Sequence, residues 1–264
     1  MIDWDDAFDN SGYVPDAAEI GATWLADAAA FRADAVAEIV LNYGAGDREA
    51  LDLFLPEAEP RGTVVFVHGG YWHSRAKSDW SHFAAGFLAS GWAVAVLGYP
   101  LAPQVRVSQI TACIADGVAH VAGRTAGPLR LVGHSAGGHL VSRMMCSGVL
   151  AADVVDRILR VVSVSGVHDL RPLVGTKMND TLRLTEEEAV AESPSLALPC
   201  SVPVTFWVGA EERPEFLRQT RLIAESWGLK GADVSTVYDA GMNHFTVING
   251  LTEPGSALVA EVLR

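Results

Sequence analysis

Positive charge is scarce in this sequence, and that scarcity excludes one class of partner. The 264 residues include 19 Lys and Arg against 32 Asp and Glu, which gives a formal net charge of −13 at pH 7. No run of basic residues interrupts the acidic composition. Because phosphate groups bind to basic surfaces and are repelled by acidic ones, the composition argues against a nucleic-acid partner.

Cysteines and long apolar runs are also scarce. The three cysteines, Cys113, Cys146 and Cys200, are widely spaced, which favours buried free thiols over a disulfide framework or a zinc site. No apolar run approaches the ~20 residues that a membrane-spanning helix needs, and the acidic first residues lack the apolar core of a signal peptide. We therefore expect a cytoplasmic protein with no membrane partner and no metal.

What is present is a globular composition, 50% hydrophobic and 19% charged, arranged as alternating strand and helix patterns. Because buried parallel strands need crossover helices, this alternation predicts an α/β fold with a mostly parallel, doubly wound sheet and helices on both faces. The expected strands are residues 37–41, 50–55, 63–67, 93–97, 129–132, 161–164, 203–208 and 234–238. The expected helices are residues 16–32, 80–90, 110–121, the segment after Ser135, 214–227 and 256–263. The alternating polar and apolar residues of 50–55 suit an antiparallel edge strand.

Residues 166–201 break this alternation. The segment is long, polar in places and contains one helical piece. Long excursions from a compact domain often form lids or pocket walls. We expect a single domain, residues 1–264, in which residues 166–201 form a small cap.

The pentapeptide Gly133-His134-Ser135-Ala136-Gly137 matches G-x-S-x-G, the pattern of a nucleophilic serine on a tight turn between a strand and a helix. Such a turn projects the hydroxyl above the sheet, and its glycines avoid the clash that a Cβ would make with the neighbouring strand and helix. A strand pattern precedes the motif and an apolar helix pattern follows it. This context favours Ser135 as a nucleophile over an incidental serine in a small-residue turn.

A second glycine-rich turn, His68-Gly69-Gly70-Tyr71-Trp72, follows the strand expected at residues 63–67. Acyl transfer produces an oxyanion, which fixed backbone N–H groups stabilise without reorganisation, and glycines let the main chain approach a substrate closely. The motif is similar to the HGG-type loop of lipases and esterases. That similarity implies an oxyanion hole formed by the N–H groups of Gly69, Gly70 and Ala136.

The candidate base and acid lie after later strands, because the chain order that accompanies this type of nucleophile turn is nucleophile, acid, histidine. Of the eight histidines, His244 lies in the loop just beyond the strand expected at 234–238, and we predict that it is the base. The strand expected at 203–208 is followed by Glu211 and Glu212 and by no aspartate. From position alone, either glutamate could orient the imidazole.

The chain as a whole resembles the kynurenine formamidase (arylformamidase) family, in the hormone-sensitive-lipase-like branch of the α/β hydrolases. The resemblance spans roughly residues 63–245. Its more discriminating parts are the Tyr-Trp pair after His-Gly-Gly, the stretches 164–173 and 179–185, and the Gly-x-x-x-x-Pro-Glu-Phe segment at residues 209–216. It implies an α/β-hydrolase fold and Glu212 as the triad acid, at a position where the family usually has aspartate.

The resemblance also implies a reaction that needs no cofactor. Ser135, activated by His244, would attack the formyl carbon of an aryl formamide such as N-formyl-kynurenine. The aryl amine would then leave, and water would release formate from the acyl-serine.

Three residues are expected to bind such a substrate. Tyr71 and Trp72 would line a flat slot for the aromatic ring, with core packing of the loop as the alternative. Asn179 in the cap would hold the amino-acid end.

Two rival interpretations stay open. A carboxylesterase acting on small acyl or aryl esters would use the same triad. A non-catalytic relative that binds a ligand would show an incomplete triad or a blocked oxyanion loop. The sequence also leaves a homodimer open.

Overall fold

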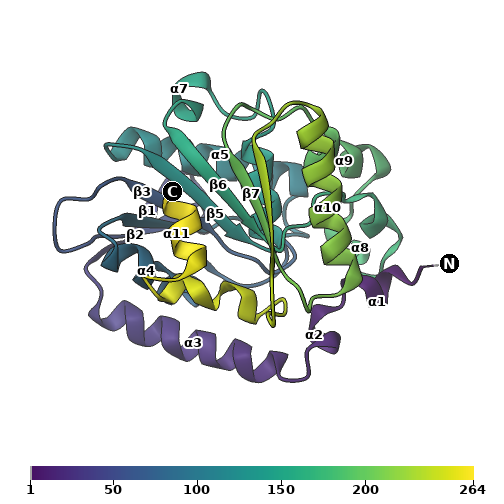
Figure 1. Cartoon of the computed structure of the whole chain (residues 1–264), viewed down its shortest axis with the longest axis horizontal. Helices are drawn as coiled ribbons and strands as arrows, with labels where there is room; N and C mark the ends of the chain where they lie inside the picture. Colours follow the sequence, from purple (N-terminus) through teal and green to yellow (C-terminus); the bar gives the residue numbers. More distant parts are fainter. Residues whose placement is uncertain (1) are drawn as a thin grey trace.

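One mixed β-sheet forms the centre of the molecule in the computed structural model, which describes residues 2–264 (Figure 1). Its eight strands follow the order β1-β2-β4-β3-β5-β6-β7-β8. β2 runs antiparallel to β1 and to β4, and the other neighbours pair in parallel, which confirms the mostly parallel sheet. The strands are β1 (Ala37–Asn42), β2 (Ala50–Phe54), β3 (Thr63–Val67), β4 (Ala93–Leu97), β5 (Leu129–His134), β6 (Ile158–Val164), β7 (Val204–Gly209) and β8 (Val234–Asp239).

β2 departs from one expectation. It is antiparallel, as predicted, but β1 pairs with its outer side, so the prediction of an edge strand was wrong. Asp52, the polar residue that suggested a solvent-facing side, is fully buried. Its carboxylate accepts hydrogen bonds from Arg32, Lys77 and the backbone N–H of Val40. A buried carboxylate with several donors and two cations is tolerated inside a sheet.

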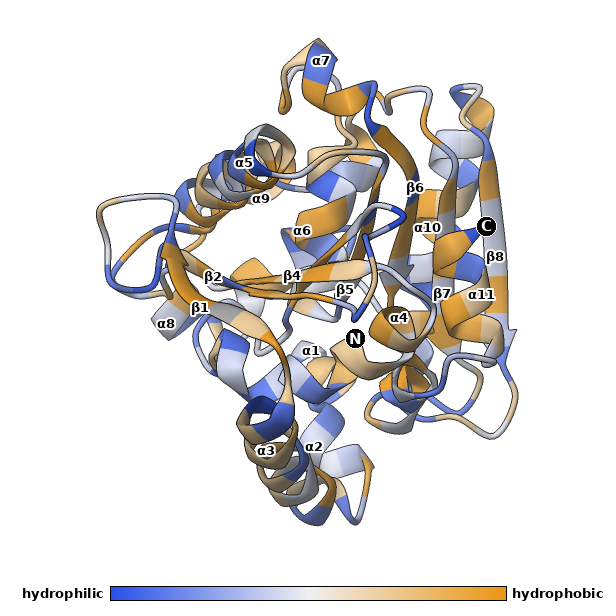
Figure 2. Cartoon of the chain, turned by 90° about the vertical axis from the view of Figure 1, so that its left-hand side faces the viewer, coloured by the Kyte–Doolittle hydropathy of each residue, from blue (hydrophilic) through white to orange (hydrophobic). Residues whose placement is uncertain are grey.

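Helices cover both faces of the sheet, as predicted. One face packs against α5 (Val107–Arg124), α6 (Ala136–Met144) and α10 (Pro214–Leu229). The other packs against α3 (Ala17–Asp34), α4 (Ala85–Ala89), α11 (Ala257–Leu263) and two 3₁₀ segments, η1 (Lys77–Ala84) and η4 (Thr246–Thr252). In Figure 2 the strands between these two layers are mostly in the hydrophobic colour.

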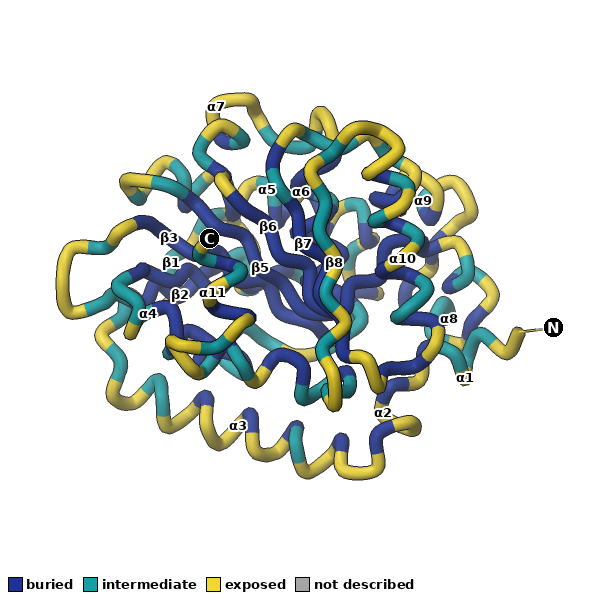
Figure 3. The backbone as a smooth tube through the Cα atoms, in the orientation of Figure 1, coloured by how far each residue is buried: buried dark blue, intermediate teal, exposed yellow. Residues whose placement is uncertain are grey.

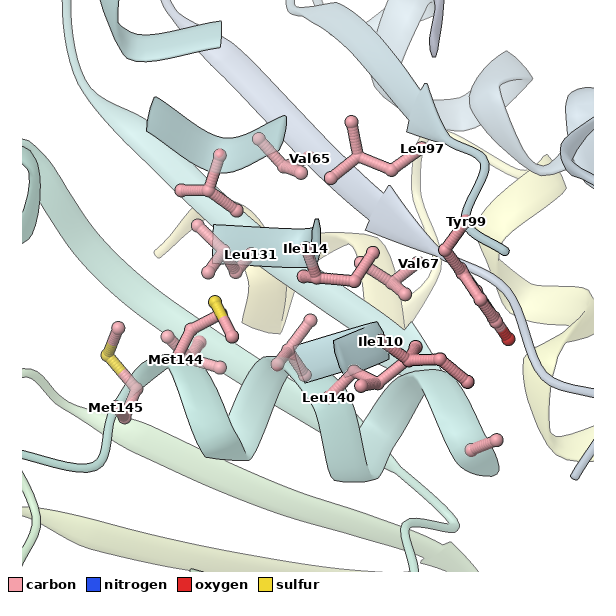
Figure 4. Packing of buried hydrophobic residues seen from close by; sticks show 14 of the residues in the cluster. Val65, Val67, Leu97, Tyr99, Ile110, Ile114, Leu131, Leu140, Met144 and Met145 are labelled. Atoms are coloured by element: carbon pink, nitrogen blue, oxygen red, sulfur yellow. The ribbon is translucent and has the colours of Figure 1, made fainter. Parts of the chain in front are cut away.

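Successive residues of the central strands supply the two halves of the core. Val65 of β3 belongs to one half, together with Ile114 of α5 and Leu140 of α6 (Figure 4). Its neighbour Phe66 belongs to the other half and lies with its ring centroid 6.3 Å from that of Phe83 in η1. β3 is therefore buried on both faces, as its unbroken apolar run predicts.

Three segments lie outside these layers. The N-terminal helices α1 (Trp4–Phe8) and α2 (Asn10–Tyr13) lie towards the end of the sheet where β5, β6 and β7 finish (Figures 1 and 3). Residues 166–201 contain η2 (Arg171–Gly175), α8 (Asn179–Leu182), α9 (Glu186–Ala191) and η3 (Pro194–Leu196), and they pack on the side of α6 and α10. α7 (Ala152–Val155) precedes β6. Within residues 2–264, no helix combines the length and apolar character needed to cross a membrane.

Candidate active site

Ser135 lies on a strained turn between β5 and α6. Its backbone has φ 55° and ψ −117°, in the left-handed half of φ space that costs an ordinary side chain of order 1–3 kcal/mol. The turn is fixed by two backbone bonds: the N–H of Ser135 donates to Val164 O at 2.8 Å, and its carbonyl accepts from His139 N at 3.0 Å. The turn places the side chain of Ser135 at the carboxyl end of β5, at the edge of the central strands.

The glycines of the G-x-S-x-G motif are sterically required at this turn. A Cβ on Gly133 would lie 2.2 Å from Gly137 O, and a Cβ on Gly137 would lie 1.9 Å from Val67 O. Both separations are far inside van der Waals contact and involve backbone atoms, which cannot move aside cheaply. The motif therefore keeps the turn of Ser135 packed directly against β3.

The loop after β3 passes over Ser135. A Cβ on Gly69 would lie 3.0 Å from His134 O and 3.1 Å from the Ser135 Cβ. Gly70 has φ 114°, and a Cβ there would clash with Ser74 O at 2.4 Å. Within residues 2–264 the N–H groups of Gly69 and Gly70 donate to no protein acceptor. The N–H of Ala136, the first residue of α6, is also among those that lack an intrahelical acceptor.

His68 lies beneath this loop rather than in the cavity. Its ring stacks on Tyr99 with centroids 4.2 Å apart, and the Tyr99 hydroxyl donates to His68 O at 2.9 Å. Burial lowers the pKa of His68 to about 3, so the ring is neutral.

His244 and Glu212 form a buried pair, each only 3% exposed. The imidazole Nδ1 lies 2.7 Å from Glu212 Oε2. Because Nδ1–H donates to the carboxylate, Nε2 is the nitrogen left to accept a proton. Glu211 is exposed, so the geometry selects Glu212 from the two glutamates.

The second oxygen of Glu212 is also held. Oε1 accepts a hydrogen bond from Gly209 N at 2.9 Å and another from the hydroxyl of Ser165. Ser165 has φ 52° and directly follows β6. Sequence reasoning missed this serine, because the contact joins residues 47 positions apart.

Ser135 and His244 line one cavity of about 140 Å³. Within the described residues, the Ser135 hydroxyl makes no hydrogen bond to the imidazole; catalytic hydrogen bonds are often unformed without substrate. The remaining lining residues come from the loop after β3, from η1, α2, α3 and the end of β5, and from the loop of His244. They are Asn10, Ser11, Trp24, Gly70, Tyr71, Ser74, Arg75, Trp80, His134 and Phe245.

His134, the residue before the nucleophile, braces the candidate base. Its Nε2 lies 2.8 Å from His244 O, and the two rings are 4.8 Å apart. Burial, together with the neighbouring His244, holds the pKa of His134 well below its usual value. The ring is therefore neutral and donates through Nε2 to the backbone of the base.

The structure separates the three residues expected to bind substrate. Tyr71 lines the cavity, whereas Trp72 is fully buried and its indole N–H donates to His139 Nδ1 at 3.2 Å. Trp72 therefore follows the core-packing alternative. The side chain of Asn179 bonds to Val174 O, Leu184 O and Leu184 N within its own loop, and Asn179 does not line the cavity.

Residues 166–201 supply none of the described residues that line this cavity. Asn10 and Ser11 of α2 line it instead. The Tyr71 hydroxyl donates to Phe8 O and accepts from Asn10 Nδ2 at 3.0 Å. Arg213, next to Glu212, bonds both carboxylate oxygens of Asp6 at 3.0 Å and Asp9 O at 2.6 Å.

These N-terminal contacts join positions 61 to 207 residues apart, so no local pattern announces them. A signal for Arg75 was present: it is a basic residue just after the glycine loop in an acidic chain. Among the described residues, no group of three His, Cys, Asp or Glu side chains is arranged to hold a metal ion.

Comparison with known proteins finds relatives over most of the chain. A family model described as the alpha/beta hydrolase family matches residues 64–259. Kynurenine formamidase of Danio rerio is 30% identical over 250 residues, covering 88% of this chain and 84% of that protein. The enzyme of that name from Salmo salar is 31% identical over 257 residues, with coverage of 88% and 84%. A crystal structure described as a candidate thioesterase from Silicibacter sp. TM1040 is 44% identical, with 100% of both chains covered and a TM-score of 0.95.

Proposed function

The chain belongs to the alpha/beta hydrolase family and is a hydrolase related to the kynurenine formamidases, and we propose that it is a serine hydrolase of aryl formamides such as N-formyl-kynurenine. The products are kynurenine and formate. The observation that carries the proposal is the buried His244–Glu212 pair on the cavity that Ser135 enters from its strained turn.

The first half of the reaction forms an acyl-enzyme. His244 Nε2 takes the proton of the Ser135 hydroxyl, whose Oγ attacks the formyl carbon. Glu212 keeps the imidazole in the required tautomer and stabilises the imidazolium. The oxyanion is bound by the N–H groups of Gly69, Gly70 and Ala136, and one such donor is worth about 10²–10³ in turnover.

The second half releases the products. The C–N bond of the tetrahedral intermediate breaks as His244 returns its proton to the aryl amine, which leaves as kynurenine. Water, deprotonated by His244, then attacks the formyl-serine, and formate departs as Ser135 regains its proton. The balance requires one water molecule and no cofactor.

A second candidate function is thioester or carboxylic ester hydrolysis by the same residues. The 44% identical relative described as a candidate thioesterase favours it. The two reactions differ in how the leaving group departs. An aryl amine must be protonated by His244 as it leaves, whereas a thiolate leaves without that proton.

The test ranks substrates for the wild-type enzyme. We expect kcat/KM for N-formyl-kynurenine of ~10⁴ M⁻¹ s⁻¹ or more, the ordinary range for a true substrate, and above the values for p-nitrophenyl acetate and a short-chain acyl thioester. Cleavage of the ester or thioester alone would refute the formamidase assignment and leave a hydrolase of the second kind.

Three free cysteines accompany this site. Cys113 and Cys146 are buried and Cys200 is partly buried. Unpaired thiols are typical of a reducing compartment, which supports a cytoplasmic location for the enzyme.

A further inference from the structure

Arg75 places an unpaired positive charge on the catalytic cavity. Arg75 is exposed. Within residues 2–264 its side chain makes no hydrogen bond or ion pair with the protein, and it lines the cavity. Among the described residues that line this cavity, it is the only one with a permanent charge. In a chain of formal charge −13, an anionic group of a ligand meets favourable electrostatics at this point of the cavity and repulsion over much of the remaining surface.

The position of this guanidinium is built by two glycines. A Cβ on Gly70 would lie 3.0 Å from Arg75 Cγ, so the stem of the arginine runs beside the candidate oxyanion loop. A Cβ on Gly21 of α3 would lie 3.2 Å from Arg75 Nη2, so the missing side chain of Gly21 leaves room for the guanidinium. Arg75 has φ 74°, and Arg48 donates to its carbonyl, which holds the strained backbone.

Asn10, which also lines this cavity, has an unused acceptor. The residue is 4% exposed, and its Nδ2 donates to the Tyr71 hydroxyl at 3.0 Å. Because that hydroxyl gives its proton to Phe8 O, it can only accept from Asn10, which fixes the orientation of the amide. Oδ1 is left buried with no partner in residues 2–264, which is unfavourable for a polar atom unless a ligand supplies a donor.

An α-amino acid group carries a chemical partner for each of these two side chains, which line the same cavity. A guanidinium binds a carboxylate through charge-assisted hydrogen bonds, and an amide oxygen accepts from an ammonium group. We propose that Arg75 binds the carboxylate of the substrate's leaving group and Asn10 Oδ1 its ammonium group. The enzyme then selects formamides of aromatic amino acids over neutral formamides. This inference rests on the proposed function and names the substrate class of the same site.

The test compares two substrates that share the scissile bond and the aromatic ketone. N-formyl-kynurenine carries the amino-acid group, and N-formyl-2-aminoacetophenone does not. A charge-assisted hydrogen bond is worth about 1.5–3 kcal/mol. R75Q should therefore lower kcat/KM for N-formyl-kynurenine by ~10–100-fold, mainly through KM, and change that for the neutral formamide by less than about twofold.

Two further variants make the comparison specific. R75K should restore part of the loss, because it returns the charge without the planar fork. R221Q removes the same charge from an exposed position of α10 that does not line the cavity, and it should leave both substrates unchanged. Equal losses for the two formamides in R75Q, or no loss, would overturn the inference.

An inhibition measurement separates this inference from the proposed function. Kynurenine and 2-aminoacetophenone can each compete with p-nitrophenyl acetate, and R75Q should raise the inhibition constant of kynurenine alone by ~10-fold or more. Formamide cleavage without this selective change would leave the function standing and refute the role of Arg75. The selective change without formamide cleavage would support the carboxylate contact and refute the formamidase assignment.

Discussion

The floor of the candidate catalytic cavity lies in the loops that follow β3, β5 and β8, whereas part of one wall comes from Asn10 and Ser11, which belong to the N-terminal segment of residues 4–13. The floor holds Ser135, Gly70 and His244, and it depends on backbone strain and on glycines whose Cβ would strike main-chain atoms. The wall is attached by polar contacts such as Asn10 with Tyr71 and Asp6 with Arg213.

This difference assigns the two regions different tasks. A floor built from strained backbone tolerates almost no substitution, so it suits the chemistry shared by any substrate. A wall held by side-chain contacts can change its lining without disturbing the strands, so it suits selectivity. Changes in the floor should therefore lower kcat for all substrates, and changes in the wall should act on KM and on the choice of substrate.

The largest effect on this comparison is expected from E212Q in the floor. The amide would present a donor to His244 Nδ1 and favour the wrong tautomer, so kcat should fall by ~10³–10⁴-fold for formamide and ester alike. E211Q, at the exposed neighbour, is the matched control and should stay within about twofold of wild type. Steady-state kinetics that reversed this order would show that Glu212 is not the triad acid.

Acidification should lower the free energy of unfolding of the chain through buried histidines in and next to the floor, and not through the wall. The unfolded chain titrates its histidines near pKa 6.5, whereas burial lowers the pKa of His68 and of His139 to about 3 and holds that of His134 well below 6.5. Below pH ~6.5 the unfolded state binds protons that the folded state excludes. The free energy of unfolding should then fall by up to about 1.4 kcal/mol per pH unit for each such histidine.

Urea unfolding at pH 7.5 and 5.5 measures this dependence, in a range where most carboxylates stay ionised in both states. Residues 4–13 contain no histidine, so the wall adds nothing to it. A free energy of unfolding that was flat or rose on acidification would contradict the buried neutral histidines.

A smaller effect is expected from Y71F, which loosens the wall and keeps the ring. The change removes the hydroxyl that bonds Phe8 O and Asn10 Nδ2, so the N-terminal helices lose an anchor worth about 1–3 kcal/mol. KM for N-formyl-kynurenine should rise by ~10-fold while kcat for p-nitrophenyl acetate changes little. An equal drop in kcat for both substrates would erase the distinction between wall and floor.

The smallest effect on activity is expected from N179A in the segment 166–201. Its amide satisfies three backbone groups of its own loop, so thermal unfolding should show a loss of about 1–3 kcal/mol. The value of kcat/KM should stay within about twofold of wild type. A KM raised tenfold or more would place this segment on the substrate after all.

The sequence predicted the parts of the molecule that depend on neighbouring residues. The unbroken apolar run of β3 and the glycines around Ser135 are local signals, because the strand and the turn are made by the residues that carry them. The position of Asp52 misled the prediction for β2, since its partners Arg32 and Lys77 lie 20 and 25 residues away.

The cavity walls could not be predicted for the same physical reason. Length and polarity drew attention to residues 166–201, but these features do not say which surface a segment packs on. The contact of Asn10 with Tyr71 joins two positions 61 residues apart. Tyr71 stands in a conspicuous motif, but nothing in the residues around Asn10 indicates that the two side chains meet. Such contacts are decided by the folded arrangement of β3, β7 and the N-terminal helices.

The most direct test of the account is kcat/KM for N-formyl-kynurenine in wild type and in S135A, with formate and kynurenine both quantified. S147A, at an exposed serine beyond α6, is the matched control. For wild type and S147A we expect formate and kynurenine in equimolar amounts and a kcat/KM of ~10⁴ M⁻¹ s⁻¹ or more. For a folded S135A we expect kcat/KM to fall by ~10⁴-fold or more. Formate release that survived in S135A would contradict the nucleophile and, with it, the assignment of this cavity as the active site.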